Sequence, residues 1–132
     1  MKPNKILETC LYVDDLEKAK KFYSDILGLE FYSSSEGRHV FFYCGDAMFL
    51  LFKPERTVIS EKGIPPHGGK GPGHVAFEIS EREYDSWLKK LKNNGIEIEN
   101  EVVWPEGGKS IYFRDPAGNS LELSTSKTWG LV

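Results

Sequence analysis

The residues with the clearest chemical potential are Glu8, His74 and Glu122. Each lies in a short stretch of alternating apolar and polar residues, the pattern of a β-strand with one buried face. Two carboxylates and an imidazole that converge can bind one divalent metal ion at about 2.0 to 2.2 Å. The same residue types are common on the solvated faces of ordinary strands, so residue type and spacing leave a metal site and a structural role both open.

An internal repeat places these three residues at matching points. The stretch ILETCLYVDDLEKAKKFYSDILGLEF in the first half has its counterpart in GHVAFEISEREYDSWLKKLKNNGIEI in the second. Glu8 aligns with His74, 66 residues later, and Leu50 aligns with Glu122, 72 residues later, because the second half has a longer hairpin connection. The sequence therefore predicts two copies of a strand, a helix and three strands.

A helix is predicted in each copy. Asp14 with Glu17, and Ser80 with Glu83, have the spacing of a capping box. Apolar residues then recur at helical spacing up to a glycine, which favours packing against a core over a cofactor role. The two stripes are Leu16, Ala19, Phe22, Tyr23, Ile26 and Leu27 before Gly28, and Tyr84, Trp87, Leu88 and Leu91 before Gly95.

Strand alternation predicts which side chains share a face. In the first strand Leu7, Leu11 and Val13 form the apolar face, which leaves Glu8 on the other. The same reasoning puts His74 opposite Val75, Phe77 and Ile79, and Glu122 opposite Leu121 and Leu123. If the helices cover the apolar faces, all three candidate ligands lie on uncovered faces.

Composition limits the classes of function. The chain has 132 residues, a net charge of −3 and scattered basic residues, so we expect no nucleic-acid partner. No apolar run approaches the roughly 18 residues of a membrane span, and the start MKPNKILETC lacks the apolar segment of a signal peptide. We therefore expect no membrane partner and a cytoplasmic location. Cys10 and Cys44 fit reduced cysteines within strands.

Three segments resemble the vicinal oxygen chelate superfamily, which includes glyoxalase I, fosfomycin-resistance enzymes, extradiol dioxygenases and bleomycin-binding proteins. They are VDDLEKAKKFYSDILGLEF, GPGHVAFEIS and GGKSIYFRDPAGNSLELS. The resemblance implies an α+β fold of two tandem βαβββ modules, with mixed sheets curled around a concave cleft. It implies one domain over residues 1–132, with module one at about 5–54, a linker at about 55–72 and module two at about 73–126. His74 and Glu122 match the family's metal ligands.

Two departures from the family pattern bear on the chemistry. Most metal-dependent relatives have a His where this chain has Glu8. Leu50 cannot supply the fourth ligand of glyoxalase I or of methylmalonyl-CoA epimerase, another member of the superfamily, so those two assignments are disfavoured. Three ligands, Glu8, His74 and Glu122, would leave open positions for substrate oxygens. The added carboxylate favours Mn, Fe or Mg over Zn as the divalent metal. Alternatively Glu8 acts as a general base beside a metal held by the other two.

The remaining cleft residues suggest what binds. Tyr112, near the site in similar fosfomycin enzymes, is a catalytic candidate together with Glu8, although a Tyr that simply lines the barrel is an equal alternative. The predicted substrate-binding residues are Tyr12, Met48, Leu50, Phe52 and Ser110. The basic residues that would bind a phosphonate are not evident after Glu122, which weakens an antibiotic-resistance reading. The segment GIPPHGGKGPG is either a plain linker or a lid that brings His67 or Lys70 to a ligand.

These observations predict a divalent-metal-dependent enzyme acting on a small oxygenated substrate. Lyase, isomerase, dioxygenase and transferase chemistry all remain open, because the fold hosts each of them. The alternative is a metal-free protein that sequesters a small molecule, as bleomycin-resistance proteins do. The resemblance also implies a homodimer in which one subunit supplies Glu8 and its partner supplies His74 and Glu122.

Overall fold

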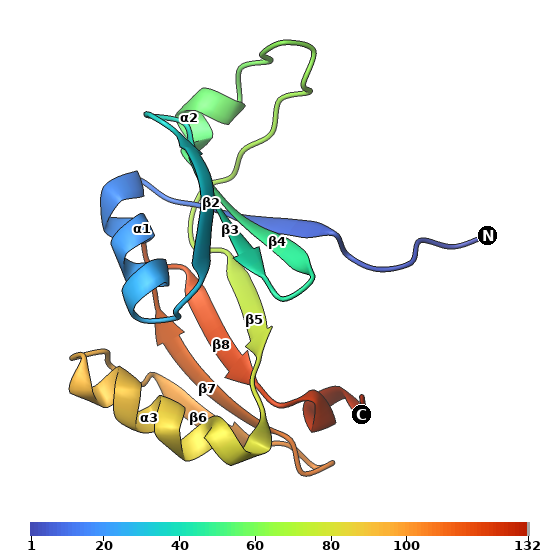
Figure 1. Cartoon of the computed structure of the whole chain (residues 1–132), viewed down its shortest axis with the longest axis vertical. Coiled ribbons are helices and arrows are strands. Elements are labelled where there is room, and N and C mark those ends of the chain that lie inside the picture. The colour runs from blue at the N-terminus through green and yellow to red at the C-terminus, as the bar shows by residue number, and fades with distance from the viewer. Residues whose placement is uncertain (132) are drawn as a thin grey trace. The chain divides into compact units, whose positions relative to one another are not determined.

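The computed structural model describes residues 1–131 and divides the chain into two compact units, Met1–Gly71 and the part that begins at Pro72. Each unit contains one four-stranded mixed sheet with a helix beside it (Figure 1). The predicted α+β class with two βαβββ modules is confirmed. No helix in the described part of the chain combines the length and apolar character needed to cross a membrane.

The first unit has the strand order β1-β4-β3-β2. β1 runs parallel to β4, and the other neighbours are antiparallel. Its elements are β1 (Glu8–Tyr12), α1 (Leu16–Asp25), β2 (Glu30–Ser35), β3 (His39–Cys44), β4 (Ala47–Phe52) and α2 (Pro54–Thr57).

The second unit repeats this topology with the order β5-β8-β7-β6. β5 is parallel to β8, so the first and last strands of each module are neighbours. Its elements are β5 (His74–Glu78), the 3₁₀ turn η1 (Glu81–Glu83), α3 (Tyr84–Asn93), β6 (Asn100–Val103), β7 (Lys109–Arg114), β8 (Ser120–Ser124) and the 3₁₀ turn η2 (Ser126–Trp129).

The strand register repeats as well. Cys10 pairs with Leu50 across β1 and β4, and Ala76 pairs with Glu122 across β5 and β8. These pairs occupy the same position in the two ladders, which confirms that Leu50 is the counterpart of Glu122. The two modules therefore share one backbone plan and differ in the side chains that it carries.

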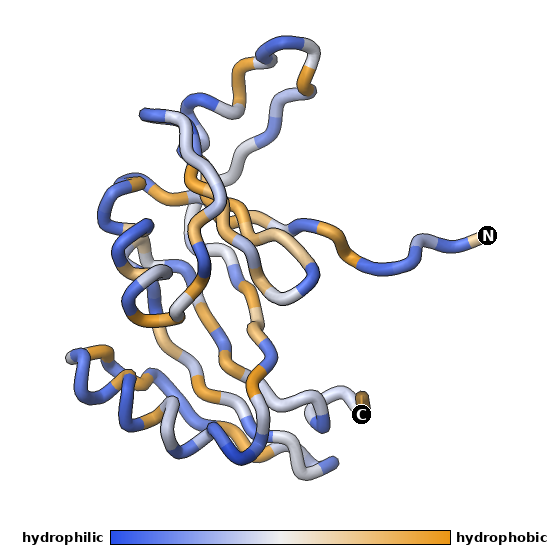
Figure 2. Tube along the Cα trace, viewed as in Figure 1, coloured by the Kyte–Doolittle hydropathy of each residue, from blue (hydrophilic) through white to orange (hydrophobic). Residues whose placement is uncertain are grey.

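Each sheet buries one face against its helix. In the first unit Val40 and Phe42 of β3 and Phe49 and Leu51 of β4 are buried, and the ring of Tyr23 of α1 contacts those of Phe42 and Phe49, with centroids 6.2 and 5.0 Å apart. In the second unit the fully buried apolar residues are Leu91, Ile111, Phe113, Leu121 and Leu123. Figure 2 shows both long helices alternating between hydrophilic and hydrophobic colours, as expected for elements with one face on a core.

The helix starts differ from the predicted capping boxes. The N-cap of α1 is Asp15, one residue after Asp14, and its carboxylate accepts from the backbone N–H of Lys18 at 3.0 Å. In the second unit the hydroxyl of Ser80 donates to Glu83 at 2.8 Å, but η1 intervenes and α3 begins only at Tyr84. In the first unit Asp14 and Asp15 are both suitable N-caps by residue type. The extended backbone of Asp15 makes it the N-cap of α1.

The connection between the modules folds onto the first unit. After α2, the backbone N–H of His67 donates to the carbonyl of Thr57 at 2.9 Å, and Nδ1 of the His67 ring is hydrogen-bonded to the hydroxyl of Tyr12 at 2.6 Å. Phe52 meets the same ring edge to face, with centroids 4.9 Å apart. A Cβ on Gly69 would lie 3.2 Å from the Tyr12 ring, so the chain passes close to that side chain.

Tyr84 ties α3 to the sheet of the second unit and gives a prediction about stability. Its hydroxyl donates to Glu101 of β6 at 3.0 Å, and burial, followed by this hydrogen bond, raises the pKa of Tyr84 to about 12. The neutral phenol is therefore favoured in the folded state. Tyr84→Phe should cost about 1 kcal/mol of unfolding free energy at pH 8. The difference from wild type should shrink as pH rises through about 10 to 12, where the folded phenol ionises.

Urea unfolding at several pH values measures this difference. Tyr32→Phe, at an exposed position on β2, is the matched control and should remain near wild type throughout. A Tyr84→Phe deficit that persists unchanged at pH 12 would contradict the assignment.

Candidate functional site

His74 and Glu122 meet on the face of the second sheet that α3 does not cover. His74 is the first residue of β5, and Glu122 lies at the middle of the neighbouring strand β8. Nε2 of His74 is 3.3 Å from Oε1 of Glu122. The predicted convergence of these two residues is thus present within one unit.

The turn between β7 and β8 fixes His74. Asp115 accepts backbone N–H bonds from Ala117 and Asn119 at 2.9 Å, and Gly118 has φ +91, a conformation that suits glycine. Asn119 in turn accepts the backbone N–H of Gly73 at 2.8 Å. The D-P-x-G-N turn therefore pins the residue directly before His74.

The ring of His74 is oriented by a second contact. Its Nδ1 is 3.0 Å from the backbone carbonyl of Ser120, which can only accept, so Nδ1 carries the proton. In the neutral ring Nε2 then presents its lone pair toward Glu122. This arrangement, with a backbone carbonyl fixing the tautomer, is how metal-binding histidines are usually held.

Glu122 is an unusually buried acid, with 7% of its surface exposed. The hydroxyl of Ser110 on β7 donates to its Oε2 at 2.5 Å, which leaves Oε1 facing His74. Ser110 is itself fully buried. One carboxylate oxygen is thus held by the protein while the other is turned to the imidazole.

The pair fits two neighbouring ligands of one metal ion. Two atoms that each lie about 2.1 Å from an ion stand about 3.0 to 3.4 Å apart when the angle between them is about 90 to 110°. The measured 3.3 Å falls in this range. Within residues 1–131, however, no group of three or more His, Cys, Asp or Glu is arranged to hold an ion.

Tyr112 stands beside the pair on β7. Its ring stacks on that of His74 with centroids 6.4 Å apart, and it is the ladder partner of Glu122. Burial, then the negative charge of Glu122, raises the pKa of the Tyr112 phenol. A hydrogen bond to Glu122 also contributes to the raised pKa, so the phenol is protonated near neutral pH.

The predicted residues of the first unit share one sheet face, the one opposite α1. Glu8 pairs with Met48, Cys10 with Leu50, and Tyr12 with Phe52. Glu8 is exposed, whereas Leu50 and Phe52 are buried. The neighbouring strand adds His39, stacked on Phe41 at 3.9 Å, and Arg38 lies 5.4 Å from the Phe52 ring. Sequence reasoning found the apolar wall but missed this cluster, because ring contacts between strands depend on register.

A cavity of about 390 Å³ lies in the second unit, and neither His74 nor Glu122 lines it. Its lining includes Ala76, the ladder partner of Glu122, and Trp129 of η2. Its volume is within the range of small-molecule pockets, about 300 to 1,000 Å³. Nothing in the local sequence marks this C-terminal turn as the wall of a cavity.

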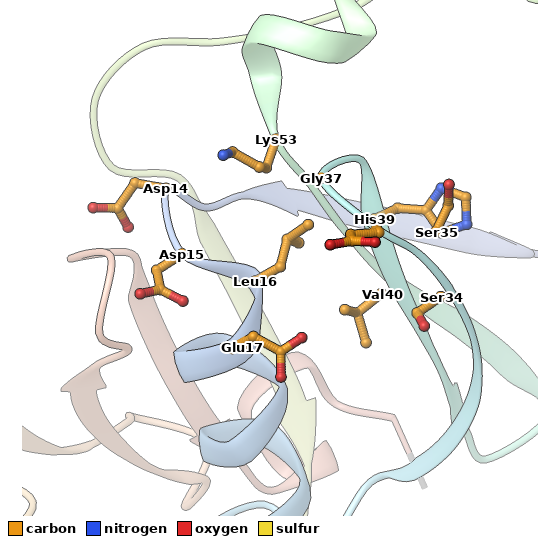
Figure 3. Close-up of a pocket in the computed structure, with 11 residues that line it drawn as sticks. Asp14, Asp15, Leu16, Glu17, Ser34, Ser35, Gly37, His39, Val40 and Lys53 are labelled. Atoms are coloured by element: carbon orange, nitrogen blue, oxygen red, sulfur yellow. The ribbon is translucent and has the colours of Figure 1, made fainter.

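A second cavity, of about 560 Å³, lies in the first unit between the start of α1 and the β2–β3 turn (Figure 3). Acidic residues surround it, but Asp15 serves as the N-cap of α1, and Lys53 pairs with Glu55 at 3.2 Å. None of the predicted site residues lines it. We assign this cavity no role in the chemistry.

Comparisons with known proteins add independent information. The family model of the Glyoxalase/Bleomycin resistance protein/Dioxygenase superfamily matches residues 5–123. The crystal structure of a lactoylglutathione lyase from Agrobacterium tumefaciens is 42% identical, with a TM-score of 0.94 and 98% of each chain covered. Metallothiol transferase FosB of Staphylococcus saprophyticus is 33% identical over 115 residues, 86% of this chain and 71% of that one. Glutathione transferase FosA of Serratia marcescens is 29% identical over 117 residues, 86% and 74% of the two chains.

The different burial of His74 and Asn119 predicts different effects of their substitution on stability. The side chain of His74 is 50% exposed, so His74→Ala should change the unfolding free energy by less than about 0.5 kcal/mol. Asn119 is 2% exposed and bonds both Gly73 and Asp115, so Asn119→Ala should cost about 1 to 3 kcal/mol. Chemical denaturation of both variants measures this contrast, and a large loss for His74→Ala would mean that His74 is structural.

Proposed function

The chain belongs to the Glyoxalase/Bleomycin resistance protein/Dioxygenase superfamily, and on that premise we propose that it is a divalent-metal-dependent enzyme acting on a small oxygenated substrate. The observation that supports this most directly is the 3.3 Å approach of His74 Nε2 to Glu122 Oε1. The tautomer of the first and the orientation of the second are both fixed by other contacts. Such preorganisation is expected of metal ligands.

The proposed donor set is His74 and Glu122 of one subunit with Glu8 supplied by the other subunit of a homodimer, because within residues 1–131 no three such groups of one chain are arranged to hold an ion. A divalent ion held there would act as a Lewis acid toward a substrate oxygen. Leu50 takes the position in the first ladder that Glu122 takes in the second, so the chain offers three ligands at the four repeated positions. Three protein ligands leave coordination positions for substrate, which suits metal-assisted chemistry.

The chain's own residues would bind and orient the substrate. Tyr112, held in its protonated form beside Glu122, is placed to donate a hydrogen bond to a substrate oxygen near the pair. The cavity lined by Ala76 and Trp129 is proposed to accept an apolar part of the molecule. In the first unit Tyr12, Met48 and Phe52 are proposed to add apolar contacts.

The relatives suggest which reactions to assay first. Their names, lactoylglutathione lyase, metallothiol transferase and glutathione transferase, all refer to a thiol or a glutathione adduct. We favour thiol transfer over the lyase reaction for this chain, because Leu50 lacks a ligand atom at the fourth repeated position.

The alternative is a metal-free binding protein. It is favoured by one observation: within residues 1–131 no three acidic, His or Cys groups are arranged around a common point. In that case the 3.3 Å contact between His74 and Glu122 is a structural contact between the two strands. A homodimer is part of the proposed enzyme, because β1 and β5 are edge strands that a second copy of the chain would cover.

Metal binding separates the two functions. At about one hundred times its dissociation constant, a metal that binds only the folded state adds about 2.7 kcal/mol of stability. We expect Mn²⁺, Fe²⁺, Mg²⁺ or Zn²⁺ to raise the unfolding temperature, with the effect lost in His74→Ala and in Glu122→Gln. Thermal unfolding against chelator measures it. Failure of all four ions to stabilise the wild type would favour the sequestering protein.

The role of Glu8 is tested by changing its ligand chemistry. Glu8→Ala should weaken metal binding at least tenfold if this carboxylate is a ligand, whereas a general base would leave the affinity unchanged and lower only turnover. Glu8→His should shift selectivity from Mn²⁺ toward Zn²⁺ by about tenfold, because imidazole is the softer donor. Competitive titration of the two ions measures the shift. Met48→Leu, on the ladder partner of Glu8, is the matched control.

A further inference from the structure

A chain of hydroxyl groups leads from the C-terminal turn to the Glu122 carboxylate. Thr128 Oγ1 on η2 is 2.9 Å from Ser124 Oγ, which is 2.9 Å from Ser110 Oγ. Ser110 Oγ is 2.5 Å from Glu122 Oε2. The indole Nε1 of Trp104, in the β6–β7 connection, also reaches Ser110 Oγ, at 2.8 Å.

The proton of each hydroxyl can be assigned. An ionised carboxylate only accepts, so Ser110 must donate its single proton to Glu122. An indole N–H only donates, so Ser110 accepts from Trp104. Because Ser110 has no second proton, Ser124 must be the donor in the contact between them. Thr128 must then donate to Ser124, and every bond of the chain points toward Glu122.

We propose that this one-way chain, from Thr128 through Ser124 and Ser110 with Trp104 as a second donor, positions the Glu122 carboxylate for ligand binding. Ser110 fixes Oε2, so that Oε1 remains turned to His74. The inference rests on the proposed function for the identity of what Glu122 binds. The hydrogen-bonded chain itself does not depend on it.

The surroundings hold the start of the chain in place. Thr125 bonds β7 twice, through its backbone N–H to the carbonyl of Lys109 at 3.1 Å and through its hydroxyl from the Lys109 N–H at 3.0 Å. The backbone N–H of Thr128 donates to the Thr125 carbonyl at 3.0 Å. A Cβ on Gly108 would lie 2.2 Å from the Thr128 nitrogen, so only glycine lets the hairpin approach this turn.

This arrangement assigns roles that sequence left open. Ser110 was expected to contact substrate, yet its one proton and both of its lone pairs are engaged by Glu122, Trp104 and Ser124. Ser110 and Trp104 are both positioning residues, because they act on a ligand only through the Glu122 carboxylate.

The first measurement needs no metal. The indole N–H resonances of the three tryptophans are recorded by nitrogen-15 NMR, and the Trp104 signal is identified by its loss in Trp104→Phe. Ser110→Ala removes the acceptor of this N–H, so the signal should move upfield and exchange faster with solvent. Thr128→Val should move the same signal by a smaller amount, whereas Thr128→Ser, which keeps the donor, should leave it in place.

The second measurement is calorimetric titration with Mn²⁺. Loss of a contact that orients a metal ligand typically lowers affinity about 10- to 100-fold, and we expect this for Ser110→Ala. Thr128→Val should weaken binding severalfold, and Thr128→Ser should restore it. Lys127→Ala, on the same turn with an exposed side chain, is the surface control.

The outcomes separate this inference from the proposed function. An unchanged Trp104 signal in Ser110→Ala overturns the chain, as does equal Mn²⁺ affinity of the Thr128→Val and Thr128→Ser proteins. If Ser110→Ala does not fold, the Thr128 pair still decides. If wild type binds no metal, the proposed function fails, and the Trp104 signal in the Thr128 pair alone decides whether the chain exists.

Discussion

A carboxylate that loses most of its water must regain hydrogen bonds from the protein, and Glu122 imposes this constraint on the second unit. Leaving it ionised and unpartnered would cost several kcal/mol. Ser110 satisfies one oxygen and His74 faces the other. In the described residues no buried side-chain nitrogen or oxygen lacks a partner. A leucine at this position, as at Leu50 in the first unit, would avoid the constraint. The presence of a glutamate therefore points to chemistry rather than to stability.

The two modules carry different residues at this position although their strand ladders match. Both ladders have the same order and register, so the backbone would accept either residue at either place. The first unit carries Leu50 and an aromatic cluster around Phe52, whereas the second carries Glu122 and a polar network. The same backbone plan thus carries a largely aromatic face beside Glu8 in the first unit and a buried carboxylate in the second.

The sequence predicted what depends on period and repeat. Strand alternation of period two put His74 and Glu122 on one face, and the repeat offset correctly aligned Leu50 with Glu122. Contacts set by tertiary register could not be predicted. By sequence alone Ser110 is an ordinary polar strand residue. Its contact with Glu122 depends on the pairing of β7 with β8, in which Ser110 lies opposite Ser124, two residues from Glu122. The cap at Asp15 was missed for a related reason, because two adjacent aspartates offer equal caps by sequence.

Strand β8 explains why two turns distant in sequence matter to one site. At its start, Asn119 pins Gly73, and the Ser120 carbonyl orients His74. At its end, the Ser124 hydroxyl accepts a hydrogen bond from Thr128 and donates one to Ser110, which in turn donates to Glu122. A shift of β8 by one residue would turn Glu122 into the core and remove the carbonyl beside His74. Both candidate ligands, His74 and Glu122, therefore depend on a single register, which the D-P-x-G-N turn and the C-terminal turn hold from opposite ends.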